Sequence, residues 1–143
     1  MLFAGSKWKP NIQAVEEMIK ISPALADSIL FLVVGGVGDD FMSQASDKIQ
    51  FTGFVEKIDD YLLAADMAIN PMISGSGSNI KMFEYLAVGL PVVSTEFGVG
   101  GLCPEAKGYI MIAEIQKMSE LINRLFINLH KDSHHSKPLI DYA

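Results

Sequence analysis

Short apolar runs rich in β-branched residues alternate with amphipathic stretches along the whole chain. The apolar runs have the length and composition of buried strands, and the stretches between them repeat apolar residues at helical spacing. Because each run is followed by a segment that can pack on a sheet, the alternation predicts an α/β fold. Strands are expected at residues 1–5, 29–34, 49–55, 67–70, 91–94 and 109–112.

Helices are expected between these strands. In the helix predicted at residues 79–88, Ile80, Phe83 and Ala87 should face inward. Repeated β-α units of this length require right-handed crossovers, so the pattern predicts a doubly wound parallel, Rossmann-like sheet with helices on both faces. The other helices are expected from Pro10 to about residue 23, at residues 56–65 and at residues 114–130, with a short polar helix or turn at residues 39–45.

The composition fits one domain spanning residues 1–143 and excludes several kinds of partner. A net charge of -6, with 11 Lys and Arg scattered along the chain, provides no basic surface for nucleic acid. The one cysteine, Cys103, allows no internal disulfide, so a cytoplasmic location is expected. The longest apolar run, residues 29–34, is too short to span a bilayer, and no direct membrane insertion is expected.

Glycine-rich loops follow the predicted strands. Doubly wound sheets bind ligands at the carboxyl ends of their strands, so these loops predict a ligand site. Trp8 either lines this cleft or packs under the first loop, and packing is favoured. His130 and His134 would share a helical face, but a solvated helix end is expected there and not a metal site. The loops that should form the site are Gly5-Ser6, Gly36-Val37-Gly38, residues 53–55 and residues 74–78.

The most informative segment is the Ser-Gly loop at residues 74–78 with the helix after it. Free amides at a helix N-terminus favour a phosphate. Lys81 and Glu84, three residues apart, project from one side of the helix, where an ammonium could neutralise a pyrophosphate and a carboxylate could accept bonds from ribose hydroxyls. The spacing alone leaves another interpretation open, in which the loop is ordinary and the two charges form a solvated pair.

Residues 84–95 resemble the donor-binding motif of glycosyltransferase family 4, the group 1 glycosyltransferases, whose members have the GT-B fold. That motif is Glu-x7-Glu, then small and apolar residues, Gly-x-Pro and a valine-rich strand, and Glu84, Gly89 and Pro91 match its second half. The resemblance extends in order over nearly all the chain, through Phe3-Ala4-Gly5-Ser6 with Trp8, Pro10 and Asn11, then Val33 to Gly38, then Ile49 to Val55.

The resemblance implies that Glu84 holds the donor ribose, that the Phe54-Val55 backbone faces the base and that Gly5-Ser6 lies near the pyrophosphate. Two departures are visible. The first glutamate of the motif falls at Ser76, and the usual phosphate-binding Arg and Lys are replaced by Ser6 and a residue near Asn11. Residues 75–81 resemble a subgroup with Gly-Ser-Gly-x-x-x-Lys, which makes Lys81 the compensating cation.

The residues expected to contact the donor are Gly5, Ser6, Gly38, Phe54, Val55, Ser76, Gly77, Ser78, Asn79, Lys81 and Glu84, with Lys81 and Glu84 as the catalytic pair. The resemblance further implies the C-terminal, nucleotide-sugar-binding domain of a retaining enzyme. Its donor would be a UDP- or GDP-linked sugar, with no cofactor or metal required. The N-terminal acceptor-binding domain would be absent, so the isolated chain should be inactive, and membrane association through that missing domain stays open.

Two other functions stay open at this stage. A non-enzymatic nucleotide-binding module would share the same motifs, and the loss of the first glutamate at Ser76 fits a retired enzyme. A Rossmann-type oxidoreductase fragment is less favoured, because it would need an acidic residue after the second strand, where Gly35-Gly36 stand. Gly36-Val37-Gly38 also lacks the third glycine of a dinucleotide fingerprint.

Overall fold

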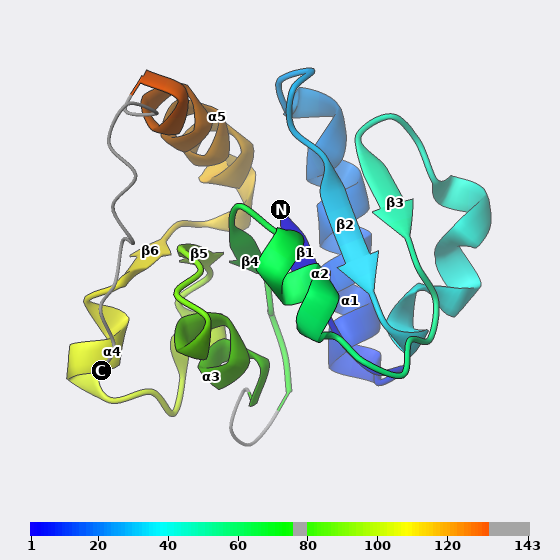
Figure 1. Cartoon of the computed structure of the whole chain (residues 1–143), viewed down its shortest axis with the longest axis horizontal. Helices are drawn as coiled ribbons and strands as arrows, with labels where there is room; N and C mark the ends of the chain where they lie inside the picture. The colour runs from blue at the N-terminus through cyan, green and yellow to red at the C-terminus, as the bar shows by residue number, and fades with distance from the viewer. Residues whose placement is uncertain (76–79, 132–143) are drawn as a thin grey trace.

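The strands form one parallel six-stranded sheet in the order β3-β2-β1-β4-β5-β6 (Figure 1). The structure is a computed structural model that describes residues 1–75 and 80–131. The chain runs outward from β1 through β2 to β3, returns to β4 beside β1 and continues outward to β6. The strands are β1 (Leu2–Ala4), β2 (Phe31–Val34), β3 (Ile49–Phe51), β4 (Ala68–Asn70), β5 (Val92–Ser94) and β6 (Ile110–Ile112).

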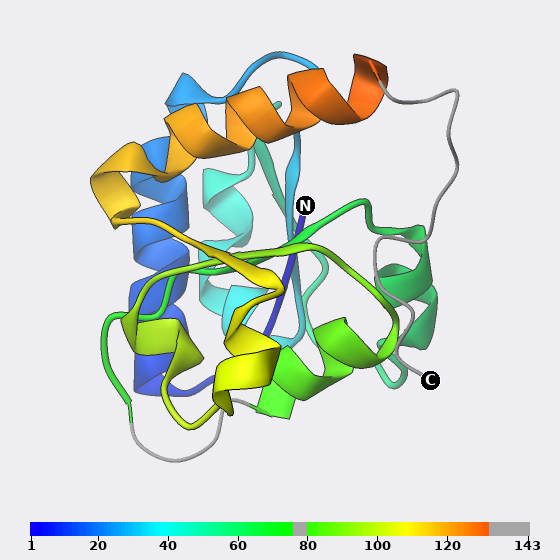
Figure 2. The same cartoon turned by 90° about the vertical axis from the view of Figure 1, so that its left-hand side faces the viewer.

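Helices cover both faces of this sheet, as Figure 2 shows. On β1, Phe3 points to the face covered by α1 and α5, while Leu2 and Ala4 point to the face covered by α2 and α3, because neighbouring side chains alternate along a strand. The doubly wound α/β prediction is therefore confirmed. The α-helices are α1 (Lys9–Ile21), α2 (Asp59–Ala64), α3 (Ile80–Ala87), α4 (Pro104–Lys107) and α5 (Ile115–Lys131); short 3₁₀ helices are η1 (Ser22–Ala24), η2 (Gly36–Gln44) and η3 (Phe97–Val99).

The order of the strands reverses between β1 and β4, which are direct neighbours through Leu2 and Ala68. The connections from β1 and from β4 therefore leave in opposite directions, which leaves a crevice at the carboxyl ends of these two strands. No helix in residues 1–75 and 80–131 is long and apolar enough to cross a bilayer.

The inward face of α3 differs from the prediction. Ile80 and Phe83 are 68% and 51% exposed, and the residues that face the sheet are Met82, Tyr85 and Leu86. Apolar side chains stand on nearly every side of this helix, so its sequence admits two possible stripes. A polar contact selects which of the two stripes faces the sheet: the amide nitrogen of Ala4 donates to the Tyr85 hydroxyl oxygen at 2.9 Å.

The third strand is shorter than predicted, since β3 ends at Phe51 and the expected strand continued to residue 55. Gly53 has φ of +70°, a left-handed conformation that ends the extended chain there. Its carbonyl accepts a hydrogen bond from the amide of Gly35 at 3.1 Å, which draws the loops after β2 and β3 together. The segment from Phe54 onward consequently runs along the carboxyl edge of the sheet.

Candidate functional site

A cavity of about 440 Å³ lies at the carboxyl edge of the sheet, at the ends of β1 and β2 and next to the point between β1 and β4 where the strand order reverses. Five segments supply its walls: the loops after β1, β2 and β3, the start of α1 and the first turns of α3. Trp8, Asn11, Gly35, Gly36 and Ile80 are among its lining residues. The predicted residues that line it are Gly5, Ser6, Phe54, Val55, Lys81 and Glu84.

Two glycines allow close approaches to the loop after β1, one by the loop after β2 and one by the start of α1. Gly35 has φ of +108°, and a Cβ atom there would collide with the carbonyl oxygen of Gly5. A Cβ atom on Gly5 would lie 2.8 Å from Nδ2 of Asn11, too close for a real contact. A larger side chain at Gly35 would push the loop after β1 away from the loop after β2, and one at Gly5 would push Asn11 of α1 away from the end of β1.

Asn11 joins the loop after β1 to α3. It lies in the first turn of α1, where Pro10 stands near the helix start, and it is only 4% exposed. Its Nδ2 donates to the carbonyl oxygen of Ser6 at 3.0 Å, and its Oδ1 accepts a hydrogen bond from Nζ of Lys81 at 2.6 Å. Asn11 thereby fixes the position of a cation against the loop that follows β1.

The Lys81 ammonium lies among neutral groups. Besides Asn11, Nζ is 3.9 Å from the sulfur of Met72 and 4.3 Å from the centroid of the Phe3 ring. Burial lowers the pKa of Lys81 from its ordinary 10.5 to about 8, and the nearby Glu84 carboxylate opposes this shift. The interpretation of Lys81 and Glu84 as a solvated ion pair is wrong, since Lys81 is partly buried and bonded to Asn11.

Glu84 lines the cavity but is exposed. Its apolar neighbours in sequence do not bury it, because Tyr85 and Leu86 turn inward to the core and Phe83 turns outward to solvent. Burial raises the pKa of Tyr85, whose hydroxyl accepts the hydrogen bond from Ala4. That bond ties α3 to the end of β1 and so places Lys81 and Glu84 over the cavity.

Among the described residues, one predicted site residue, Gly38, does not line the cavity. Gly38 is buried and packs against Phe51, away from the cavity lining. Residues 76–79, which are Ser76, Gly77, Ser78 and Asn79, lie outside the described residues. Trp8 is 45% exposed and lines the cavity, so the favoured expectation that it packs under the first loop is wrong.

A second cavity, of about 600 Å³, lies farther along the same edge, at the ends of β4, β5 and β6. Among the described residues that line it, the titratable ones are Glu96 and Glu114, so an anion would meet repulsion there. In the first cavity Lys81 supplies a positive charge. In residues 1–75 and 80–131 no group of His, Cys, Asp and Glu side chains could hold a metal ion.

The strand order defines an α/β domain of the Rossmann type. Lys81 lines the cavity near the point where that order reverses, so the cavity can accept an anion. The family model for group 1 glycosyl transferases matches residues 1–128. The chain therefore belongs to the group 1 glycosyl transferases, and the resemblance seen at residues 84–95 is confirmed.

Solved structures of glycosyltransferases have the same fold. WaaG, a glycosyltransferase involved in lipopolysaccharide biosynthesis, superposes with a TM-score of 0.69 at 19% identity over 88% of this chain and 37% of its own. Anabaena HepE in complex with UDP and glucose gives 0.69 at 15% identity over 91% and 39%. The pneumococcal O-GlcNAc transferase GtfA in complex with UDP and GlcNAc gives 0.53 at 14% identity over 92% and 29%. No curated protein matches the chain in sequence.

Proposed function

We propose that this chain is the donor-binding domain of a retaining glycosyltransferase and that the cavity beside β1 and β4 takes the nucleoside diphosphate of a nucleotide sugar. The observation that supports this most is the gathering of Gly5, Ser6, Lys81 and Glu84, which come from segments far apart in sequence, around one cavity. Membership of the group 1 family supports the same chemistry.

Within the cavity we assign the diphosphate to the loop after β1 and to Lys81. A protonated ammonium and backbone amides stabilise the charge on a departing diphosphate without a metal ion. The exposed carboxylate of Glu84 is free to accept two ribose hydroxyls, and the neighbouring wall of Phe54 and Val55 would face the base. The prediction from the sequence that Ser76, Gly77, Ser78 and Asn79 contact the donor concerns residues outside the described part of the chain.

The base is proposed to be uracil, with GDP-sugars as the second choice. HepE and GtfA were both solved with UDP bound, and their fold is the fold of this chain. This chain spans 37% and 39% of the length of WaaG and HepE. We propose that a second α/β domain supplies the acceptor site, and that the chain alone binds the donor nucleotide but transfers no sugar.

The first test of this function is calorimetry with UDP, GDP, ADP and NAD. We expect measurable binding of a nucleoside diphosphate and none of NAD. A preference for NAD would favour the oxidoreductase alternative, and sugar transfer by this chain alone would contradict the need for a second domain. Nucleotide binding in a full-length protein that transfers no sugar would favour the non-enzymatic module.

Glu84→Gln tests the ribose contact. Hydrogen bonds to a charged acceptor contribute about 1.5 to 3 kcal/mol, so UDP affinity should fall roughly tenfold to a hundredfold. The wild-type chain should bind UDP better than 2′-deoxy-UDP, and the variant should discriminate much less. Glu96→Gln is the matched control, because Glu96 lines the second cavity and should leave both affinities unchanged. Equal binding of the two nucleotides by the wild type would remove Glu84 from the site.

A further inference from the structure

Asn11 is a buried polar side chain whose two ends are both engaged. Nδ2 donates to the Ser6 carbonyl and Oδ1 accepts from Lys81. An amide offers a donor nitrogen and a separate neutral acceptor oxygen on one short side chain. An aspartate would place a carboxylate against the Ser6 carbonyl, and an aliphatic residue would leave both partners without a hydrogen bond. Asparagine therefore satisfies both partners without adding a charge.

The consequence concerns the charge of Lys81. Several other lysines of residues 1–75 and 80–131 pair with a carboxylate within 4 Å, among them Lys7 with Asp40 and Lys48 with Asp27. The partners of the Lys81 ammonium are an amide oxygen, a thioether and an aromatic ring. None of these carries a negative charge, so the charge of Lys81 stays available to a ligand in the cavity.

We propose that Asn11 is a positioning residue, which holds the Lys81 ammonium against the loop after β1 through a neutral contact and so keeps its charge free for the diphosphate of the donor. The inference rests on the proposed function, and it deepens that function by naming the group that orients the phosphate-binding cation. A lysine fixed in advance loses less conformational freedom when the ligand binds.

The burial of Lys81 also makes diphosphate binding sensitive to pH. Because burial keeps the pKa of Lys81 near 8, the ammonium loses its proton as the pH rises through about 8, and UDP affinity should fall in that range. Glu84 on the same helix is the charged group that acts on Lys81; the groups that face it from α1, from β1 and from the segment after β4 are Asn11, Phe3 and Met72, all neutral.

The test is Asn11→Asp, which places a carboxylate beside Lys81 with almost no change in shape. The carboxylate should neutralise the ammonium and raise its pKa well above the wild-type value. UDP affinity should then fall roughly tenfold or more, while uridine affinity changes less than about twofold, since uridine has no phosphate. Calorimetry gives both affinities, and NMR of Nζ-labelled lysine, assigned with Lys81→Met, gives the pKa.

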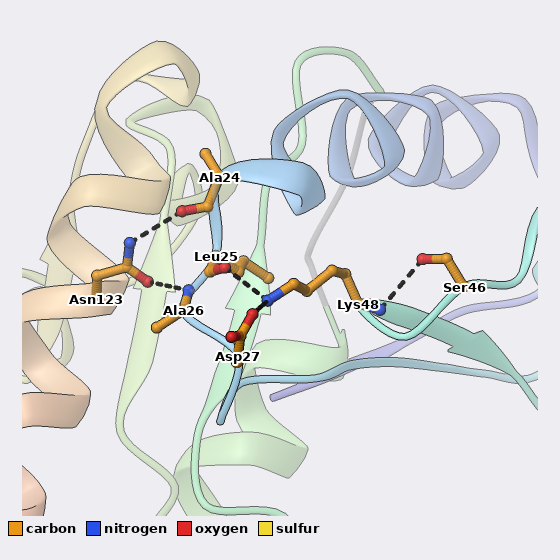
Figure 3. Close-up of polar contacts among 7 residues, drawn as sticks. All are labelled: Ala24, Leu25, Ala26, Asp27, Ser46, Lys48 and Asn123. Atoms are coloured by element: carbon orange, nitrogen blue, oxygen red, sulfur yellow. Dashed lines mark hydrogen bonds and ion pairs between the residues drawn. The ribbon is translucent and has the colours of Figure 1, made fainter.

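Two further variants separate positioning from folding. Asn11→Ala removes the contact without adding a charge, so UDP affinity should fall less than in Asn11→Asp and the Lys81 pKa should not rise. Asn123→Asp is the matched control, because the Asn123 amide on α5 also has both ends engaged: it accepts from the Ala26 amide and donates to the Ala24 carbonyl (Figure 3). Asn123 is not among the residues that line the cavity. This change should leave both affinities and the Lys81 pKa unaltered.

The outcomes distinguish this inference from the function on which it rests. A wild-type chain that binds no nucleoside diphosphate contradicts the proposed function, and the role of Asn11 falls with it. If the wild type binds UDP and Asn11→Asp binds it equally well, only the role of Asn11 is contradicted. Two other results would also contradict the role of Asn11: an equal loss of UDP and uridine affinity in Asn11→Asp, or an unchanged Lys81 pKa in that variant. Either result would mean that Asn11 has only a structural role.

Discussion

Two lysines, Lys48 and Lys81, are partly buried at opposite edges of the same sheet. Lys48 precedes β3 at the amino edge, where Nζ contacts the Leu25 carbonyl oxygen and Asp27 Oδ1, each at 2.8 Å (Figure 3). Lys81 lies at the carboxyl edge and contacts Asn11, Met72 and the Phe3 ring. Lys48 therefore has a full negative charge as its partner, whereas Lys81 contacts no carboxylate within residues 1–75 and 80–131.

The difference indicates that the lysine at the amino edge stabilises the fold, whereas the lysine at the carboxyl edge is suited to bind a ligand. At the amino edge Lys48 ties the segment before β2 to the segment before β3, and its charge is neutralised by its partner. At the carboxyl edge the Lys81 charge is held in place and left unneutralised, which costs stability because a buried ammonium is poorly solvated. Such a cost is typical of groups that act on a ligand.

The largest expected effect is the loss of UDP affinity when the charge of Lys81, but not that of Lys48, is removed. Lys81→Met keeps most of the apolar stem and should weaken UDP binding roughly tenfold to a hundredfold, since a charge-assisted bond to phosphate is lost. Uridine affinity should hardly change. Lys48→Met, the matched variant, should leave both affinities unaltered and lower stability instead, because the Leu25 carbonyl loses its partner. Equal loss of UDP and uridine binding in Lys81→Met would mean that Lys81 does not face the phosphates.

The next effect is the pH dependence of stability that Lys81 causes. Its pKa in the fold is near 8 and its ordinary value is 10.5, so between these values the unfolded chain binds the proton more readily. Stability should therefore rise with pH in this window. The cost of the buried ammonium is fully present below pH 8. The free energy of unfolding of the wild type, relative to Lys81→Met, should increase by about 1 to 2 kcal/mol from pH 8 to 10.5, allowing for solvent screening of a partly exposed group.

Urea unfolding of both proteins at several pH values measures this difference. Taking the difference removes the titration of all other groups, which the two proteins share. Stability and UDP affinity should move in opposite directions, because deprotonation relieves the burial cost and removes the charge that binds phosphate. A difference that stays flat or falls between pH 8 and 10.5 would show that the Lys81 ammonium is well solvated.

The hydrophobic pattern predicts the strands and the edge that carries the site, but not the orientation of α3. Buried parallel strands are continuous apolar runs, so their positions and the α/β fold follow from the hydrophobic pattern. Glycine-rich loops after strands, with Lys81 and Glu84 three residues apart, indicated the carboxyl edge as the site. The inward face of α3 did not follow, because apolar residues surround that helix and the Ala4 to Tyr85 hydrogen bond selects its orientation.

The sequence did not predict the contact between Asn11 and Lys81, for a different reason. The two residues are 70 positions apart, and only the return of the chain from β3 to β4 brings α3 beside α1. Asn11 itself looks like an ordinary polar residue in the first turn of a helix. Its burial depends on Gly5, whose missing side chain makes room for the amide.

The smallest expected effect belongs to the ion pair at the amino edge. Asp27→Asn removes the carboxylate but leaves Lys48 its bond to the Leu25 carbonyl, so the loss should be smaller than in Lys48→Met. Lys48 lowers the pKa of Asp27 below its ordinary 3.8, and the pair therefore stabilises the fold above that pH and is lost as the pH falls through the lowered value. Thermal unfolding at low salt should show a small deficit for Asp27→Asn at pH 7. The deficit should vanish in strong acid and shrink in high salt, because the Asp27 side chain is fully exposed. UDP affinity should not respond at all. A deficit that persists unchanged in acid would mean that Asp27 acts through its shape, and the comparison between a neutralised and an unneutralised lysine would then rest on Lys81 alone.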